Sequence, residues 1–441
     1  MVEIIRFFGN PAIIGNLIAL ITAIILGGTG WAIFSQFQVA QRSQFNDQLG
    51  RGAELLAHAE LTARVSGVRV LEDLAKSVKP DSDENKLVAN ILLDFVRERA
   101  APPMKEDGTP YADENAPRHT LWDGMPYESS VAWPEPKPPE ARLDIETAVL
   151  ALGNIVPEDM AARSKYLNFS RLDLRGLDLP GAKLQHAYIF HAKLQGANLK
   201  EANLQHANLD QTDLQHAVLS GANLQHAALT YATLQGAYLS SANLQNTNLL
   251  ATMTNANLWF ADLRGARLLD ASFENASLWH ADFRGADLEN VNFQGANLEN
   301  VNFQGADLKN PNFERASLAN ANLQGVNLVN ANFENLSLVG AQLQHADLRD
   351  AKFWFANLSD TNFQGVKNIS TQQLAKIIYD KDKPPQNLPD GVALPSERAY
   401  ELRDSGLMQE PYFVEIKKFV NQVLIVEAWE KKQAEETKPK K

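Results

Sequence analysis

The sequence predicts a β-solenoid, a stack of short backbone coils, over residues 166–367, and three observations predict it. A large apolar residue recurs every five positions from Phe169 to Leu249 and again from Leu258 to Phe363. An alanine mostly lies two positions earlier, with asparagine or aspartate between, which gives the pattern A-[DN]-L-x-x. Phenylalanines recur every twenty residues in the second stretch, at Phe273, Phe293, Phe313, Phe333 and Phe353. A fixed short period indicates stacked units that bury one continuous core.

The twenty-residue spacing sets the number of sides in each coil. A five-residue period fits neither a helix nor a flat strand, whereas four short sides of five residues give twenty per coil. Phe283, Phe303 and Phe363 fall ten residues out of phase, on the opposite side, and leucines occupy the other two sides. The register breaks at 250–257, because Leu249 and Leu258 are nine residues apart instead of ten. We expect such an interior to be filled by side chains, with no internal ligand pocket.

This repeat resembles that of the pentapeptide-repeat family, which implies a right-handed quadrilateral β-helix. Two earlier stretches, Val68–Ala75 and Asp144–Gly153, are similar to a membrane-anchored bacterial type. In that type a HEAT-like helical segment lies between the anchor and the repeats. The resemblance implies this domain order and a cytoplasmic repeat domain, and it implies no assigned activity.

Residues 1–40 predict a membrane anchor with one transmembrane helix over about 11–34. No charged residue lies between Arg6 and Arg42, and some 20 apolar residues span a bilayer as a helix. A cleaved signal peptide is the alternative, but no small-residue cleavage site is evident. More basic residues follow the run than precede it, so the positive-inside rule places the bulk of the chain in the cytoplasm. The prediction is a single-pass protein of the bacterial inner membrane.

Two segments are candidates for a homodimer contact. Gly15, Ala19, Ala23 and Gly27 recur every fourth residue, and small residues at this spacing let helix backbones approach closely. Such residues are also common in membrane helices, so both interpretations stay open. The second candidate is a predicted helix over 411–432 with one apolar face. Such a face is most often core or cap, and a partner-binding or dimerising face is the alternative.

The rest of the chain predicts helices and one linker. Residues 41–100 show apolar spacings of three and four, which favour amphipathic helices. Residues 101–140 hold nine of the 20 prolines and predict a linker or insert. Residues 141–165 predict a helical lead-in to the repeats. Residues 368–441 predict a helical cap on the far end, with a short helix starting at Ser370.

The search for chemistry finds no catalytic, cofactor or metal site. The chain has no cysteine and no phosphate-binding or nucleophile motif. Aspartates such as Asp173, Asp178, Asp282 and Asp307 are expected to face solvent. His186, His206 and His226 fall in one outward column, where a metal site competes with a surface column made by the repeated word LQHA. We therefore expect a protein that is not an enzyme.

Two functions fit these features. The first is a membrane-anchored scaffold that presents a rigid solenoid to an unknown protein partner. The alternative is a DNA mimic that regulates a DNA-binding protein such as gyrase, as some members of the resembled family do. Duplex DNA carries one charge per about 1.7 Å, a density that the repeat does not approach. The net charge of −12 argues against nucleic acid as a partner.

Overall fold

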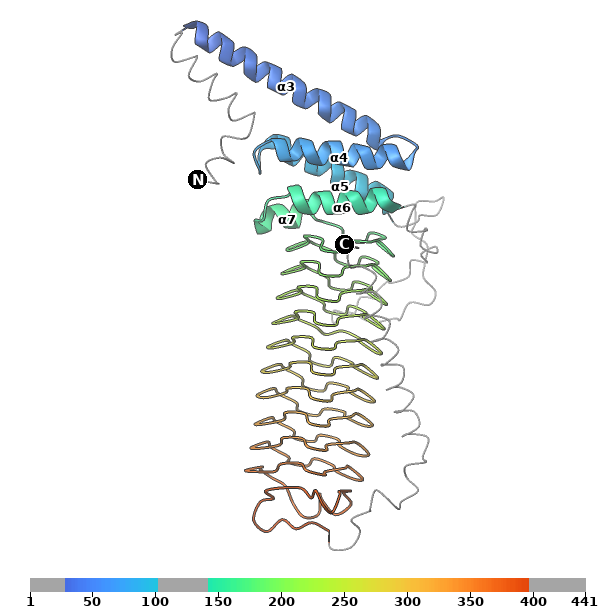
Figure 1. The fold of residues 1–441 in the computed structure, drawn as a ribbon, viewed down its shortest axis with the longest axis vertical. Helices are drawn as coiled ribbons and strands as arrows, with labels where there is room; N and C mark the ends of the chain where they lie inside the picture. The colour runs from blue at the N-terminus through green and yellow to red at the C-terminus, as the bar shows by residue number, and fades with distance from the viewer. Residues whose placement is uncertain (1–27, 102–141, 396–441) are drawn as a thin grey trace, which may run out of the picture. The chain divides into compact units, whose positions relative to one another are not determined.

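The computed structural model describes residues 28–101 and 142–395. The chain divides into two compact units, one up to Asn257 and one from Leu258. The first contains five described helices and an array of coils, and the second contains a further array and its end (Figure 1). The predicted linker over 101–140, apart from its first residue, the small-residue positions 15–27 and the helix over 411–432 lie outside the described residues.

The helices of the first unit are α3 (Gly28–Leu56), α4 (Leu61–Ser77), α5 (Asp83–Arg99), α6 (Leu143–Ile155) and α7 (Met160–Tyr166). Three of them meet at the buried carboxylate of Asp144. Arg64 of α4 and Arg99 of α5 lie 2.6 and 2.9 Å from Asp144 at the start of α6. Since breaking a buried ion pair is strongly destabilising, this triad fixes α4, α5 and α6 against one another. Among the described residues no helix is long and apolar enough to cross a membrane, and most of the predicted span lies outside them.

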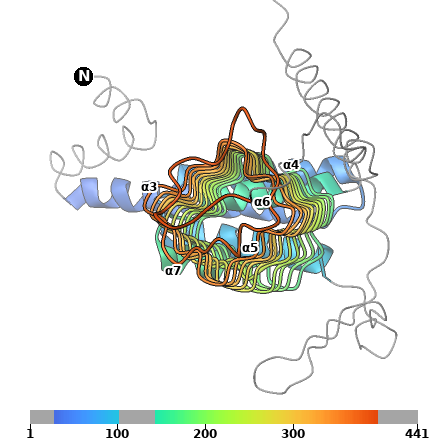
Figure 2. The ribbon, with the colours of Figure 1, turned by 90° about the horizontal axis from the view of Figure 1, so that it is seen from below.

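The first array begins at Asn168, where the backbone starts to pair with residues one coil further along. Parallel bridges join residues twenty apart, beginning with Asn168 to Tyr188 and Asp173 to Lys193. The central leucines and the alanines before them are buried, so each side turns two side chains inward. The predicted four-sided solenoid with an N-terminal helical segment is confirmed, and the coils of each array overlie one another in Figure 2.

Each corner of a coil is a tight turn that explains the polar half of the repeat. The N–H of Ala187 donates to the carbonyl of Leu184 at 3.0 Å, and His186 between them has φ of 59°. This left-handed conformation favours glycine and asparagine, which are frequent at this position. The side chain of the preceding asparagine or aspartate accepts from the N–H two residues on, as Asn203 does from Gln205 at 3.1 Å. The [DN] of the pattern is therefore a turn former.

The register break is a shortened corner near the end of the first array. At Leu249 the N–H of Ala251 donates directly to the carbonyl of Leu249, at 2.9 Å. This three-residue turn replaces the usual four-residue turn and removes one residue from the coil. The spacing of the backbone bridges changes accordingly, because Thr233 pairs with Thr252 and Tyr238 with Asn257, nineteen residues apart instead of twenty. One deleted residue is thus absorbed at a corner, and Thr233 and Tyr238 still pair with the coil that contains it.

The helices cover the open edge of the first coil. Arg163 of α7 is 1% exposed and donates to the carbonyls of Lys183 and Gln185, at 2.8 and 2.9 Å. The same guanidinium donates to Gly153 and Val156 at the end of α6. These bonds satisfy backbone acceptors that a bare solenoid end would expose. A β-carbon on Gly153 would lie 2.8 Å from the carbonyl oxygen of Lys183, so only glycine allows this approach.

The second array holds the predicted phenylalanine columns. Phe273 and Phe293 stack with ring centroids 5.2 Å apart, and Phe293 and Phe313 at 5.3 Å. The opposite column repeats this with Phe283 and Phe303 at 5.1 Å. All of these rings are fully buried. The stacked columns predicted from the twenty-residue spacing are confirmed.

The far end of the second array departs from the sequence prediction. The short helix expected from Ser370 is a run of turns, because the chain after it returns to pair with the last coils. Asn357 pairs with Ile378 and Asn362 with Gln386, so longer excursions replace the five-residue sides. Leu374 and Ile377 are buried over the end of the core. Among the described residues of 368–395 this end is therefore an irregular coil and not a helical cap.

Candidate interaction surfaces

Outward side chains of each array form columns along its axis, because paired residues lie twenty positions apart. His186, His206 and His226 show the spacing directly, with neighbouring ring centroids 4.9 Å apart. A column can therefore place chosen groups at steps of about 4.8 Å on a backbone that hydrogen bonds hold rigid. Any function of the arrays depends on what these columns carry.

An aromatic cluster stands out at one corner of the second array, and we call Trp259, Phe260, Trp279 and His280 the aromatic corner. Phe260 stacks on His280, with centroids 5.2 Å apart and planes 5° from parallel. Trp279 meets Phe260 and His280 edge to face, at 5.0 and 4.2 Å. Such offset and perpendicular arrangements are favoured by aromatic quadrupoles. The rings therefore support one another in a fixed arrangement.

The aromatic corner is open to solvent on one side and anchored on the other. Phe260 is 52% exposed, while Trp259 is buried and its indole N–H donates to the hydroxyl of Ser277. His280 is exposed and Trp279 is partly exposed. Large aromatic side chains held rigidly at a surface are typical anchors of protein interfaces.

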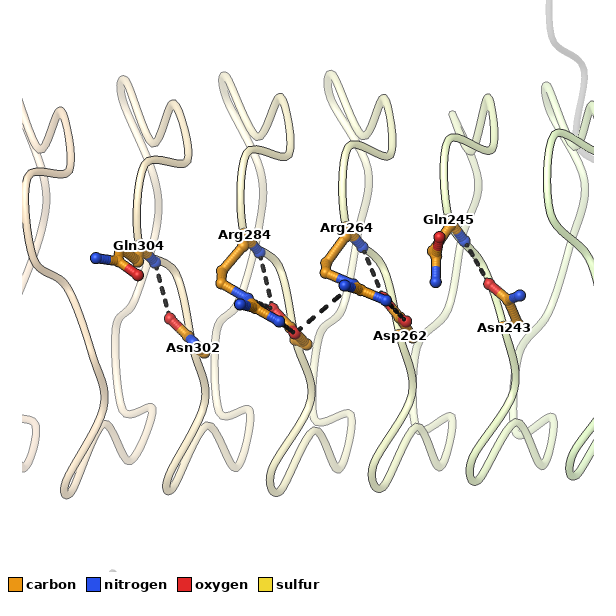
Figure 3. Close-up of polar contacts among 8 residues, drawn as sticks. Asn243, Gln245, Asp262, Arg264, Arg284, Asn302 and Gln304 are labelled. Atoms are coloured by element: carbon orange, nitrogen blue, oxygen red, sulfur yellow. Dashed lines mark hydrogen bonds and ion pairs between the residues drawn. The ribbon is translucent and has the colours of Figure 1, made fainter.

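Paired charges line the next side of the second array (Figure 3). Arg264 lies 2.7 Å from Asp262, and Arg284 lies 2.6 Å from Asp282. Arg264 also reaches Asp282 of the following coil at 3.9 Å. Each aspartate accepts in addition from the backbone N–H of its own arginine. These four groups balance one another, so this side contributes no net charge beside the aromatic corner.

The two arrays differ in charge. The first, residues 168–257, has five acidic and five basic side chains and no net charge. The three coils of 258–317 have nine acidic and five basic side chains, hence a net charge of −4, and 318–367 have four and three, hence −1. The aromatic corner therefore lies in the most acidic part of the described solenoid. Even there the charge density is lower than that of DNA, because duplex DNA of the length of three coils would carry about nine charges.

The histidine column does not have the geometry of a metal site. The rings of His186, His206 and His226 are parallel to within 3° and 9°. Imidazole lone pairs lie in the ring plane, so stacked parallel rings cannot direct them at one ion. Among residues 28–101 and 142–395, no group of three or more His, Cys, Asp or Glu could hold a metal ion. Burial, followed by the charges of His186 and His226, lowers the pKa of His206.

One aspartate expected to face solvent is instead part of the helix junction. Asp173 accepts from Arg175 at 2.9 Å and lies 3.4 Å from Arg142, and it is largely buried. Burial alone would raise the pKa of Asp173, but the hydrogen bond from Arg175 and the charge of Arg142 lower it. The expectation is therefore wrong for Asp173, because the helices cover the first coil. Asp178 and Asp307 are exposed, as expected.

A second aromatic pair lies near the end of the second array. Trp354 and Phe355 are 51% and 48% exposed. The ammonium group of Lys376, from the irregular last coil, lies 4.6 Å from the centroid of the Trp354 ring. This is a cation–π contact, so the exposed face of Trp354 already has an intramolecular partner.

The aromatic corner has a signal in the sequence that the inward pattern does not include. The segments LWF at 258–260 and LWH at 278–280 are twenty residues apart. The spacing that predicts the phenylalanine columns therefore also places these four rings together.

Comparison with known proteins agrees with the repeat. A family described as "Pentapeptide repeats (8 copies)" matches overlapping segments from 168–205 to 267–305, and "Pentapeptide repeat region" matches 296–372. No curated protein matches the chain significantly in sequence.

Several solved structures are similar to parts of the chain. The pentapeptide repeat protein HetL of the cyanobacterium Nostoc, involved in heterocyst differentiation regulation, is 32% identical over 44% of this chain and 89% of its own, with a TM-score of 0.44. A pentapeptide repeat protein of the Arabidopsis thaliana thylakoid lumen is 29% identical over 20% and 63%, with a TM-score of 0.15. QnrB1, a plasmid-mediated fluoroquinolone resistance protein, is 19% identical over 42% and 86%, with a TM-score of 0.21.

Proposed function

The chain belongs to the pentapeptide repeat protein family, and on that premise we propose that it is a non-enzymatic, membrane-anchored scaffold. Its solenoid would hold a protein partner through the aromatic corner of the second array. The observation that carries this proposal is the set of four interlocked rings with Phe260 52% exposed. Rigid, exposed aromatic side chains lose little conformational entropy on binding, which suits them to anchor an interface.

The filled interior supports an outer-surface function. Fully buried phenylalanines stack along the second array, and leucines and alanines fill the first. A ligand would therefore meet only the outward columns and the two ends. Among the outward groups of the described residues, the aromatic corner combines the largest ring cluster with the strongest net charge of the coils around it.

The membrane part of the proposal rests on the charge-free run at 11–34 and on the basic residues that follow it. We propose one helix across the bacterial inner membrane with the repeats in the cytoplasm. Alkaline carbonate should leave the protein in the membrane pellet, and protease added to right-side-out spheroplasts should leave the repeats intact. Extraction by carbonate would contradict the anchor, and cleavage of the repeats would contradict their placement.

The scaffold role is tested by crosslinking the full-length protein in its own membranes, followed by purification. We expect one or a few partners to depend on the aromatic corner and to be lost from the double variant Phe260→Ala, Trp279→Ala. The matched control is Tyr231→Ala, which removes a 57% exposed ring from the first array. Equal recovery of every partner from both variants would contradict the proposal.

The DNA-mimic alternative receives no support from the surface charge. The net charge of −4 over the three coils of 258–317 is less than half of the DNA value of about nine. A gyrase supercoiling assay with the full-length protein gives a direct test. Inhibition at stoichiometric ratios would favour the mimic over the scaffold.

A further inference from the structure

We propose that the partner presents arginine side chains to the aromatic corner, so that the scaffold recognises an arginine-bearing segment of another protein. This inference rests on the scaffold function proposed above and names the chemistry of its partner. Three observations carry it: a ring and a carboxylate in one column, a cation bound on the face of another outward indole, and the local charge.

Trp279 and Glu299 occupy the same position of adjacent coils. The backbone shows this, because Phe260 donates to the carbonyl of Trp279 at 3.0 Å and His280 donates to that of Glu299 at 3.1 Å. The indole and the carboxylate therefore leave the array about 4.8 Å apart along its axis. Glu299 accepts one hydrogen bond, from the hydroxyl of Ser317 at 3.1 Å through Oε1. Its second carboxylate oxygen has no partner among the described residues.

Trp354, near the end of the second array, shows that an outward indole of this solenoid can take a cation on its face. The backbone N–H of Phe355 donates to the carbonyl of Lys376 at 2.8 Å, so Lys376 follows Trp354 in one column. The Lys376 ammonium lies 4.6 Å from the Trp354 ring centroid. In the column of Trp279 the corresponding position carries Glu299 instead, and among the described residues no lysine or arginine makes such a contact with Trp279.

The net charge of the coils favours a cationic partner, and the planar guanidinium group favours arginine as its side chain. The coils of 258–317 have a net charge of −4, which attracts a cationic segment and repels nucleic acid. A guanidinium is planar, so it stacks flat on an indole while its edge donates to a carboxylate. The ammonium group of lysine has neither a flat face nor a forked pair of N–H donors. A column with a ring next to a carboxylate is therefore better matched by arginine than by lysine.

The test measures binding of fluorescently labelled peptides to the full-length protein in nanodiscs, by anisotropy. The probes are (Gly-Arg)4, (Gly-Lys)4 and (Gly-Glu)4, which have equal length and differ in their charged side chain. We expect (Gly-Arg)4 to bind about tenfold more tightly than (Gly-Lys)4 and (Gly-Glu)4 not to bind. Rising salt should weaken both cationic peptides while the preference for arginine persists.

Substitutions test whether Trp279 and Glu299 cause the preference for arginine. Trp279→Ala should abolish the arginine preference, Trp279→Phe should retain most of it, and Glu299→Gln should weaken (Gly-Arg)4 by about tenfold. The matched control is Trp354→Ala, whose ring already carries Lys376, and it should bind (Gly-Arg)4 as the parent protein does. Far-ultraviolet circular dichroism establishes that each variant is folded. Glu299→Gln is conservative enough to decide the question if Trp279→Ala does not fold.

Equal binding of the arginine and lysine peptides would overturn the inference, as would an effect of Trp354→Ala as large as that of Trp279→Ala. Tighter binding of (Gly-Glu)4 would overturn it as well. Loss of crosslinked partners from the Phe260→Ala, Trp279→Ala variant, with no arginine preference, would leave the scaffold function standing and remove only its arginine chemistry. Retention of those partners would instead contradict the scaffold function at this site.

Discussion

The two arrays have the same backbone and differ in what they place inside and outside. The first has a leucine core, a column of stacked histidines and no net charge. The second has two phenylalanine columns, the aromatic corner and a net charge of −5, from thirteen acidic and eight basic side chains over 258–367. Their bridges and corner turns follow the same rule.

This contrast indicates that backbone and core specify the solenoid, whereas the outward columns are free to specify binding. Hydrogen bonds between coils and alanines at the inward positions recur in both arrays, so neither accounts for a function. Corner residues can exchange glycine for asparagine or histidine, provided that the left-handed conformation is kept. The repeats of this chain therefore differ from one another at the outward positions, where a partner would make contact.

The largest expected effect comes from breaking the core of the second array. Phe313→Ala removes a fully buried ring from the middle of a stacked column and should lower the free energy of unfolding by about 3–5 kcal/mol. Hydrogen exchange should show the loss of protection concentrated in coils of 258–367, because solenoid stability depends on nearest neighbours. A uniform loss of protection over both arrays would contradict the expectation that the core of the second array can be destabilised without destabilising the first. Leu214→Ala is the matched change in the first array.

A smaller effect is expected from uncovering the first array. Arg163→Met removes four hydrogen bonds from a guanidinium to backbone carbonyls, and it should destabilise the first unit by about 3 kcal/mol. Exchange should quicken in the first coil and in α6, while the second array is unaffected. Lys165→Met, an exchange of a nearby cation outside this network, serves as the control. Unchanged exchange in the first coil would show that the helices do not act as its cover.

The asparagine column of the second array allows turn strain to be separated from side-chain bonding. Asn310 has φ of 54° and donates to Asn290 at 3.1 Å, and Asn330 donates to Asn310 at 3.0 Å. Asn310→Ala should lower stability by about 1–2 kcal/mol, because alanine resists the left-handed conformation. Asn310→Gly should lose less, since it keeps the turn and removes only the side-chain bonds. Equal losses measured by urea unfolding would assign the effect to the side-chain ladder instead.

The smallest effect is a pH dependence confined to the first array. Burial and the neighbouring His186 and His226 lower the pKa of His206 below its ordinary value of 6.5. The unfolded chain then takes up protons more readily than the folded chain, so stability should fall as pH decreases from about 6.5 towards the lowered pKa. His191, whose pKa burial also lowers, acts in the same direction.

His206→Gln should flatten this dependence in part and leave the contribution of His191. Thermal unfolding of the full-length protein between pH 7.5 and 5 measures it. Gln225→Ala, which removes an outward side chain of the first array that does not titrate, is the control and should leave the pH dependence as it was. A steeper dependence in His206→Gln would contradict the assignment to the stacked column.

The sequence predicted most of the solenoid because its period is local and strict. The inward positions, the coil length and the phenylalanine columns all depend on spacing alone, so counting residues was sufficient. The shortened corner at Leu249 is visible in the sequence as a break in the five-residue spacing. The sequence does not show which corner lost the residue, so it could not predict the three-residue turn. The end after Ser370 was mispredicted as helix, because pairing of Ile378 with Asn357 overrides local preference.

The candidate site was less accessible from sequence. Trp259, Phe260, Trp279 and His280 have the right spacing, but only the structure shows that three of their contacts are edge to face while Phe260 stays half exposed. The burial of Asp173 likewise depends on Arg142, which lies 31 residues earlier in the chain and in the helical cover. Contacts between the helices and the first coil follow no period, so no spacing rule predicts them.

The most direct test of a partner-binding aromatic corner places a photo-crosslinking amino acid at single outward positions of the full-length protein in its native membranes. Position 260 lies in the aromatic corner, and position 231, 57% exposed in the first array, is the comparison. We expect a discrete crosslinked protein at 260 that is absent at 231 and that disappears when Trp279→Ala is added. Crosslinks of equal yield at both positions, or at 231 alone, would contradict the claim that the aromatic corner is where the scaffold holds its partner.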